Sequence, residues 1–300
     1  MRADLDVTVA LAHALLAEQH PDLASLPLTV AANGWDNVMV RAGDDLVLRL
    51  PRRAVAAPLL ANELAALPVL APLLAVAVPD VAVPSPVRTG TPSEALGYPW
   101  PWSVLPWVDG VRAAATPVGS RLAWAPTLGR FLAALHRPVA DGVPVPHNPF
   151  RGVALRDRRP PALDLAGRAG EVWRAAVTAP AYEGPPVWIH GDPHPANLVV
   201  APGGGPGGTD LLAAVVDFGD VTAGDPASDL GTLWLTFDAA GRHACRAAME
   251  AAGVTWDDAT WTRARGWALV FAAAMLAHPD EHPALVPIGT HGLAALLDGA

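Results

Sequence analysis

The feature that most restricts the fold of this chain is a pair of apolar segments near residue 200. Residues 197–200 (NLVV) and 211–216 (LLAAVV) flank a spacer rich in glycine and proline, which can turn freely and buries no large apolar side chain. This pattern predicts a β-hairpin. Polar motifs stand at one end of it, because His190-Gly191-Asp192 precedes the first segment and Asp217-Phe218-Gly219 follows the second. We expect these motifs to form one polar cluster, which is the candidate active site.

The residue types in this cluster suit the transfer of a phosphoryl group. Such a transfer needs an aligned hydroxyl group and a phosphate charge neutralised by magnesium, which prefers oxygen ligands. The order H-x-D-x-x-x-x-N followed by D-F-G is typical of kinase active sites. Asp192 is the candidate acceptor of the hydroxyl proton, Asn197 and Asp217 are the candidate Mg²⁺ ligands, and His190 is expected to support the loop.

Three motifs resemble those of the aminoglycoside phosphotransferase family: residues 190–197 (HGDPHPAN), 217–220 (DFGD) and 224–230 (GDPASDL). The resemblance implies an α+β, two-lobed, protein-kinase-like fold, with a small antiparallel-sheet N-lobe and a larger, mainly helical C-lobe. It also implies a small-molecule kinase that uses Mg²⁺ and either ATP or GTP. By the same resemblance, Asp229 is expected to support the catalytic loop.

The expected lobes are a nucleotide-binding lobe of residues 1–106 and a catalytic and acceptor-binding lobe of residues 107–300. In the first of them, short apolar segments at 28–31, 38–41 and 46–50 alternate with turns and predict antiparallel strands. Gly34 lies in the first turn. In the resembled family this turn covers the nucleotide phosphates, although a plain hairpin turn explains Gly34 equally well.

The kinase pattern requires a cation on the third strand and a glutamate on the following helix. The chain contains no lysine, and Arg49 stands at the matching place. Its expected partner is Glu63, in a helix predicted over 59–67 and ended by Pro68. Two alternatives stay open: Arg52 or Arg53 could bind the phosphates instead, and Glu63 could lie on a solvated helix face.

Residues 100–110 (WPWSVLPWVDG) are interpreted as the last strand of the first lobe and the hinge that follows it. In kinase-like folds the hinge backbone binds the nucleotide base, so Leu105 and Trp107 are the candidate contacts. Residues 46–53 (LVLRLPRR) also resemble the corresponding strand of the macrolide kinases in the family.

Apolar periodicity predicts helices over most of the remaining chain, at 122–136, 164–178, 226–238, 242–252, 256–278 and 284–297. Only residues 220–224 separate the D-F-G motif from the helix start at Asp225-Pro226, and an A-P-E motif is absent. Because protein kinases use a longer segment here to hold a peptide, we expect a small-molecule acceptor.

Charge and composition exclude some classes of partner and location. The formal net charge of −9 over 300 residues argues against general nucleic-acid binding. The longest apolar stretch, residues 68–84, is interrupted by prolines and Asp80, and the N-terminus lacks the basic start of a signal peptide. We therefore expect a cytoplasmic protein without a membrane segment. Cys245 is the single cysteine, so no intramolecular disulfide can form.

Several functions fit these residues. The acceptor could be an antibiotic, such as an aminoglycoside or a macrolide, or a primary metabolite. The chain could also be a non-catalytic nucleotide-binding module of the same fold. A metal-dependent hydrolase using His190, Asp192 and His194 is a third hypothesis, against which Pro193 and Pro195 favour a loop over a strand.

Overall fold

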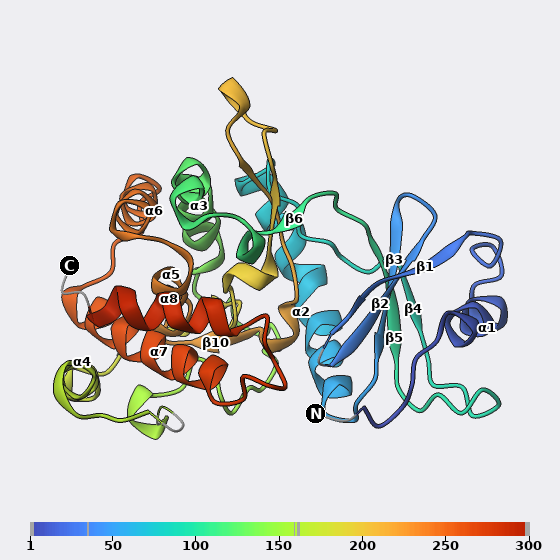
Figure 1. The fold of residues 1–300 in the computed structure, drawn as a ribbon, viewed down its shortest axis with the longest axis horizontal. Coiled ribbons are helices and arrows are strands. Elements are labelled where there is room, and N and C mark those ends of the chain that lie inside the picture. Colours follow the sequence, from blue (N-terminus) through green and yellow to red (C-terminus); the bar gives the residue numbers. More distant parts are fainter. Residues whose placement is uncertain (1–2, 35, 159, 161–162, 298–300) are drawn as a thin grey trace. The chain divides into compact units, whose positions relative to one another are not determined.

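The computed structural model describes residues 3–34, 36–158, 160 and 163–297, so Trp35 in the first turn lies outside the described residues. The chain divides into two compact units. The N-terminal unit comprises Met1–Ala71 and Pro84–Val108, and the C-terminal unit comprises Pro72–Val83 and Asp109–Ala300. Figure 1 shows the chain coloured along its sequence. The functional roles expected for the two lobes stay predictions.

The N-terminal unit is built on one antiparallel sheet with the strand order β1-β2-β3-β5-β4 (Figure 1). Its hydrophobic core lies between the sheet and helix α1, where Leu15 and Leu16 of the helix pack with Val40 and Leu48 of the sheet. Helix α1 begins after Thr8, whose hydroxyl oxygen accepts a hydrogen bond from the amide of Leu11. The elements are α1 (Val9–Gln19), β1 (Leu28–Asn33), β2 (Asn37–Ala42), β3 (Leu46–Pro51), β4 (Arg88–Gly90) and β5 (Trp102–Pro106).

Helix α2 corrects one prediction. It runs over Ala56–Ala77, so Pro68 does not end it. Pro68 and Pro72 are both exposed and lie one turn apart, so both proline rings lie on a solvent-facing side of the helix. By length and composition α2 could cross a membrane, with a third of its most apolar window (33%) buried. Core helices of soluble proteins meet the same criterion, and α2 carries the buried charge of Glu63.

The C-terminal unit contains two small sheets. The predicted hairpin is present as β8 (Leu198–Ala201) and β9 (Leu211–Val215), and β6 (Val111–Arg112) adds a third strand beside β8. Leu198 pairs with Val215, and the amide of Val216 donates to the carbonyl oxygen of Asn197 at 3.0 Å. This register brings the two predicted polar motifs to the same end of the hairpin. A second ribbon pairs β7 (Val187–Ile189) with β10 (Thr222–Gly224).

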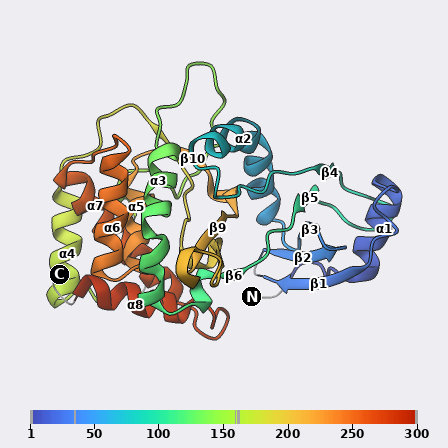
Figure 2. The ribbon, with the colours of Figure 1, turned by 90° about the horizontal axis from the view of Figure 1, so that it is seen from above.

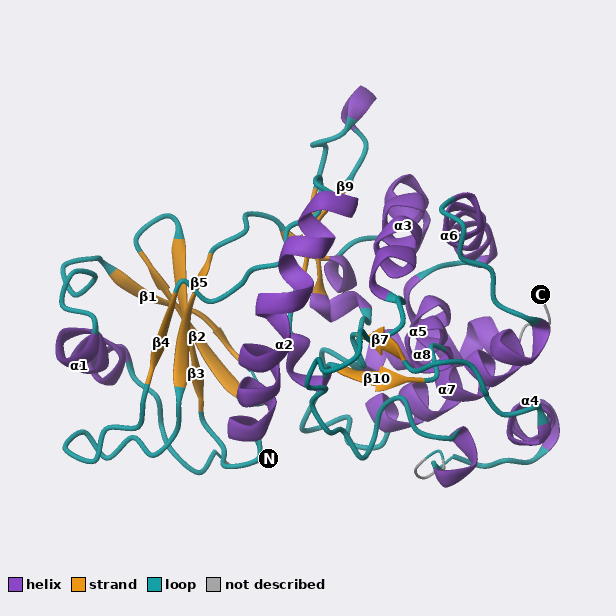
Figure 3. Cartoon of the chain, turned by 180° about the vertical axis from the view of Figure 1, so that it is seen from behind, coloured by secondary structure: helices purple, strands orange, loops and turns teal. Residues whose placement is uncertain are grey.

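Helices make up most of the C-terminal unit, and Figure 3 shows them in purple against the strands in orange. Every residue of α5 is buried, which identifies it as the central helix, and it packs against α7 and α8. In Figure 2, α3 and α6 run side by side, and these helices also pack together. The bounds are α3 (Ala125–Leu135), α4 (Gly167–Thr178), α5 (Ala227–Thr236), α6 (Ala239–Ala251), α7 (Asp258–Leu276) and α8 (Val286–Leu297). The mixed architecture confirms the predicted α+β class.

Candidate active site

The loop after β7 carries Asp192, the candidate base. The amide of Asp192 donates to Nδ1 of His190 at 3.2 Å, and the side-chain amide of Asn197 donates to the carbonyl oxygen of Asp192 at 3.0 Å. The side chain of His194 accepts from the amide of Ala196 at 3.1 Å. These short-range bonds close the loop on itself, and Asp192 keeps 22% of its side-chain surface exposed. A substrate can therefore reach the carboxylate.

His190 is fully buried and both of its ring nitrogens are engaged by the protein. Because Nδ1 accepts a hydrogen bond from the amide of Asp192, Nε2 is the nitrogen that carries the hydrogen, and it lies 3.0 Å from the carbonyl oxygen of Val216. The ring also packs on Phe218, with the ring centroids 4.4 Å apart. His190 thus ties the catalytic loop to the strand that ends just before Asp217.

Asp229, at the first turn of α5, lies beneath the same loop. Its carboxylate accepts hydrogen bonds from the amides of His190 and Gly191, each at 2.8 Å. Nε2 of the buried His136 lies 3.2 Å from the same carboxylate. Asp229 has no exposed surface, so its two oxygens serve the loop backbone and His136 rather than a substrate.

The carboxylate of Asp192 has a nitrogen donor beside each of its oxygens. Nε2 of His194 is 3.3 Å from its Oδ2, and Nη2 of Arg151 is 3.5 Å from its Oδ1. Burial disfavours the ionised form, but the neighbouring His194 and Arg151 outweigh it and hold the pKa of Asp192 well below its usual range. The group is therefore an ionised carboxylate over the whole neutral range, as a proton acceptor must be.

Asn197 and Asp217 offer oxygen donors of the kind that magnesium prefers. Because Nδ2 of Asn197 donates to Asp192, the side-chain atom of Asn197 that suits a metal ion is Oδ1. Asp217 is exposed, and it is the single residue other than glycine with a positive φ (65°) in the described part of the chain. Such backbone strain is typical of functional positions. The donor set of one amide oxygen and one carboxylate fits Mg²⁺, which takes its remaining ligands from phosphates and water.

In the N-terminal unit, Arg49 on β3 and Glu63 on α2 form a buried ion pair. Nη1 of Arg49 lies 2.5 Å from Oε2 of Glu63, and both side chains are no more than 5% exposed. Glu63 is therefore not on a solvated helix face. The neighbouring arginines contact the first turn instead: Arg52 donates to the side chain of Asn33, and Arg53 lies 3.1 Å from Asp36.

The other predicted nucleotide contacts also belong to the N-terminal unit. The amide of Gly34 donates to the carbonyl oxygen of Asn37 at 2.9 Å, which closes the turn between β1 and β2. Leu105 is buried on β5. The amide of Trp107 donates to the carbonyl oxygen of Asp45 at 2.7 Å, and its ring lies 4.7 Å from the guanidinium carbon of Arg41. A base contact at Trp107 would therefore use another atom than this amide hydrogen.

Three residues at the site were not predicted from the sequence: Asn148, Arg151 and Asp220. Arg151 lies 3.5 Å from the carboxylates of both Asp192 and Asp220. Asn148 donates to Oδ1 of Asp220 at 2.8 Å. The D-F-G-D motif contains Asp220, and so it offered a signal for that residue. Asn148 and Arg151 lie in a loop rich in proline and arginine, in which nothing in the sequence marked them.

The hydrolase hypothesis does not fit this geometry. Both nitrogens of His190 are used in hydrogen bonds to backbone atoms, so it cannot offer one to a metal without losing a buried bond. Across the residues that the structure describes, no group of three or more His, Cys, Asp and Glu side chains is arranged to hold a metal ion.

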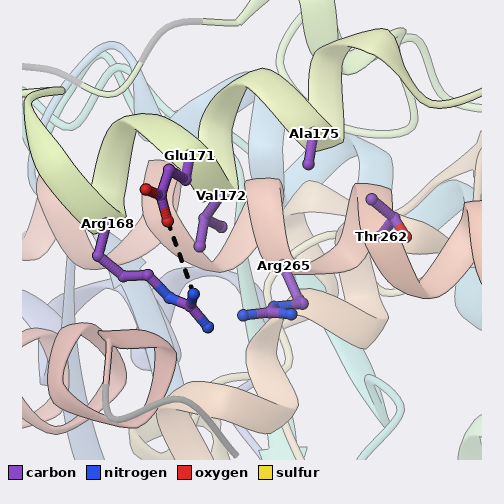
Figure 4. A pocket seen from close by; sticks show the side chains of 6 residues that line it. All are labelled: Arg168, Glu171, Val172, Ala175, Thr262 and Arg265. Atoms are coloured by element: carbon purple, nitrogen blue, oxygen red, sulfur yellow. Dashed lines mark ion pairs between the residues drawn. The ribbon is translucent and has the colours of Figure 1, made fainter.

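A small pocket of about 170 Å³ opens between α4 and α7. Figure 4 shows its lining, with Arg168 paired to Glu171 at 3.6 Å and the guanidinium group of Arg265 facing that of Arg168. Burial and the charge of Arg168 lower the pKa of Arg265. None of the predicted site residues lines this pocket.

Comparisons with known proteins bear on the family and the fold of the chain. The model of the phosphotransferase enzyme family matches residues 27–267. The solved structures that resemble the chain include aminoglycoside 2'-phosphotransferase-IIIa in complex with GDP, at 21% identity and a TM-score of 0.64, covering 97% of this chain and 98% of that chain.

Macrolide kinases also resemble the chain in structure. Macrolide 2'-phosphotransferase MphH from Brachybacterium faecium is 24% identical, with a TM-score of 0.53 over 97% of this chain and 98% of that chain. A type I macrolide 2'-phosphotransferase is 20% identical, with a TM-score of 0.55 over 98% and 99%. No curated protein matches the chain. At these identities the likeness shows the fold, which is the fold that the sequence predicted.

Proposed function

The chain belongs to the phosphotransferase enzyme family, and we propose that it transfers the γ-phosphoryl group of ATP or GTP to a hydroxyl group of a small molecule. The observation that carries this proposal is the environment of Asp192. Its carboxylate is ionised and 22% exposed, on a loop that Asn197 and Asp229 hold by hydrogen bonds. A non-catalytic nucleotide-binding module would have no use for such a base.

Asp192 would accept the proton of the acceptor hydroxyl while the hydroxyl oxygen attacks the γ-phosphorus. The new oxygen–phosphorus bond forms as the bond to the β-phosphate oxygen breaks, and the nucleoside diphosphate leaves. His194 is placed to orient the base, because Nε2 lies 3.3 Å from Oδ2 of Asp192 and Nδ1 accepts from the amide of Ala196.

Magnesium is part of the proposal. Asn197, through Oδ1, and Asp217, through its carboxylate, would hold it, and the fit of this donor set to Mg²⁺ is the support. When bound, the ion neutralises negative charge on the phosphates. His190 and Asp229 would act as supports of the loop between these residues, since both hold backbone atoms of that loop.

The nucleotide contacts proposed for the N-terminal unit are Arg49 for the phosphates, Glu63 as its partner, and the turn at Gly34. The buried pair of Arg49 and Glu63 supports the first two assignments, because it fixes a cation on β3 beside a glutamate on the following helix, as the kinase pattern requires. Leu105 and Trp107 are proposed as contacts of the nucleotide base.

We propose an antibiotic as the acceptor, either an aminoglycoside or a macrolide. The similar structures support this class: one is an aminoglycoside phosphotransferase complex with GDP and kanamycin, and others are macrolide 2'-phosphotransferases. A cytoplasmic location is proposed with it, since ATP and GTP are available there.

The test is the release of nucleoside diphosphate from ATP and from GTP with Mg²⁺, across a panel of aminoglycosides, macrolides and small metabolic alcohols. Asp192→Ala serves as the inactive variant. Asp141→Ala is the matched control, because Asp141 is an exposed carboxylate in a loop outside the site.

We expect one acceptor class to stimulate the release of nucleoside diphosphate by the parent protein and by Asp141→Ala, but not by Asp192→Ala. Removal of the base should reduce turnover by about 10²–10⁴-fold. Nucleotide binding without stimulation by any acceptor would favour the non-catalytic module instead. Turnover by Asp192→Ala near that of the parent would overturn the assignment of the base.

A further inference from the structure

Arg151 is the charged side chain closest to the proposed base that the phosphoryl-transfer motifs do not include. Its Nη2 lies 3.5 Å from Oδ1 of Asp192 and 3.5 Å from Oδ2 of Asp220. Its side chain is 17% exposed, so this is a largely enclosed three-group cluster rather than a surface ion pair. One guanidinium group therefore bridges the carboxylate that would take the proton and a second carboxylate three residues after Asp217.

The loop that carries Arg151 is fixed to the segment after Asp217 by several hydrogen bonds. Oδ1 of Asn148 accepts from the amides of Phe150 and Arg151 at 2.9 and 3.1 Å, which sets the turn. Nδ2 of Asn148 donates to the backbone oxygen of Asp220 at 3.1 Å and to its Oδ1 at 2.8 Å. The backbone that carries Arg151 is therefore held at a fixed position relative to Asp220.

Two more bonds anchor the ends of this loop. The hydroxyl of Thr222 donates to the carbonyl oxygen of Pro146 at 2.7 Å, and the amide of Asp225 donates to the carbonyl oxygen of Gly152 at 3.2 Å. The guanidinium carbon of Arg151 also lies 4.9 Å from the ring centroid of the buried Phe271 on α7. The ring covers one face of the guanidinium group and limits the directions in which it can point.

Electrostatics explain why a cation is needed between the two carboxylates. Burial and the charge of Asp192 raise the pKa of Asp220, while Arg151 opposes that rise. Without Arg151, Asp192 and Asp220 would repel each other across a partly enclosed site, and the Asp192 carboxylate would rotate away. With it, each oxygen of Asp192 faces one nitrogen donor: Oδ1 faces the guanidinium group of Arg151 and Oδ2 faces Nε2 of His194.

We propose that Arg151, held by Asp220 and Asn148, is a positioning residue that fixes the orientation of the Asp192 carboxylate toward the acceptor hydroxyl. The proposal rests on the function proposed above. Arg151 takes no proton in the reaction. It keeps Asp192 in the one orientation from which the hydroxyl proton can be accepted, and a misplacement of about 1 Å can cost about 10²-fold in rate.

The test compares Arg151→Ala, Arg151→Lys and Asp220→Asn with the parent, and Arg130→Ala is the control. Arg130 is exposed on α3, so its removal subtracts one positive charge without touching the site. We expect Arg151→Ala to lower kcat about 10- to 100-fold, with the KM for the nucleotide changed less than about threefold. Arg151→Lys should recover part of kcat, because the ammonium can still contact one carboxylate.

A double-mutant cycle separates positioning from general structural support. If Arg151 acts through its bridge to Asp220, the double variant Arg151→Ala/Asp220→Asn should lose little more kcat than Arg151→Ala alone. Guanidinium ions at tens of millimolar, below denaturing concentrations, should restore part of kcat to Arg151→Ala and none to Asp192→Ala. If Arg151→Ala fails to fold, as judged by nucleotide binding and thermal unfolding, Arg151→Lys and Asp220→Asn decide the outcome.

The results that overturn the proposal are distinct from those that overturn the function. If the parent protein shows no turnover that depends on Asp192, both the proposed function and the role of Arg151 are overturned. Turnover that depends on Asp192 but is unchanged, or raised, in Arg151→Ala overturns only the role of Arg151. Fully additive effects in the cycle would also overturn it, because they would mean that Arg151 and Asp220 act separately.

Discussion

The buried carboxylate of Asp229 gives the sharpest test of how the catalytic loop is held. We predict that Asp229→Ala lowers the free energy of unfolding and turnover together. The carboxylate accepts from the amides of His190 and Gly191 at 2.8 Å each, and Nε2 of His136 lies 3.2 Å away. Alanine would leave two buried amide hydrogens without an acceptor in a site with no exposed surface.

The size of the effect follows from these contacts. Each buried donor left without a partner costs about 1–3 kcal/mol, and more when the lost acceptor is charged. With two amides and one histidine donor left unpaired, we expect a loss of about 3–5 kcal/mol in total. In a domain of this size that corresponds to a fall of roughly 10 °C in Tm.

The assay is urea unfolding followed by tryptophan fluorescence, with Asp141→Ala as the exposed control. Asp229→Asn should also destabilise the protein, because its carbamoyl oxygen can replace one carboxylate oxygen while its NH₂ group faces another donor. A loss below about 1 kcal/mol for Asp229→Ala would refute the reasoning, since ordinary surface substitutions stay within about 0.5 kcal/mol. It would mean that water or a backbone shift satisfies the two amides.

The buried ion pair, a left-handed glycine and the single thiol give three further tests. Arg49→Ala or Glu63→Ala should each cost about 3–5 kcal/mol in urea unfolding, whereas Arg49→Met/Glu63→Leu should recover most of the stability but not nucleotide binding. Gly191→Ala should lower Tm more than Gly142→Ala does: both have positive φ (88° and 78°), but a Cβ at Gly191 would lie 2.3 Å from a backbone oxygen, whereas none lies within 4 Å at Gly142. If Tm falls equally in the two variants, the positive φ alone explains the loss, and the close approach of the Cβ at Gly191 contributes nothing. Burial raises the pKa of the Cys245 thiol, so a thiol reagent should leave the native protein unmodified and label it only after unfolding in urea.

Local sequence patterns were sufficient to predict the strands on either side of the candidate site. The hairpin of β8 and β9 could be predicted because its strands are apolar and its spacer is made of residues that favour turns. The prediction for Pro68 was wrong for an equally physical reason. Whether a proline breaks a helix depends on which groups cover the carbonyl that it leaves unpaired, and the sequence does not show that Pro68 lies on an exposed face.

The role of Arg151 could not be predicted from local sequence patterns. Its loop has no apolar period and its two carboxylate partners stand far along the chain, beyond β7 and β9. Only tertiary hydrogen bonds, such as those of Asn148 to Asp220, bring the loop to the site. A contact of this kind has no local signal, because either partner would be equally common on a solvated surface.

Exposure separates the carboxylates of the C-terminal unit into two groups. Asp229 and Asp225 are buried, and each is saturated by protein donors, with Asp225 held by Arg263 at 2.7 Å. Asp192 keeps 22% of its side chain exposed, and Asp217 is exposed on a strained backbone. A buried, saturated carboxylate can only support structure, because a substrate or a metal ion would have to displace its donors. Of these four, the two that stay accessible are those that the motifs identify as base and metal ligand; Asp220, in the same stretch, is 24% exposed and is held by Arg151. The sequence places all four within one stretch of about 40 residues, but it cannot show which of them solvent reaches.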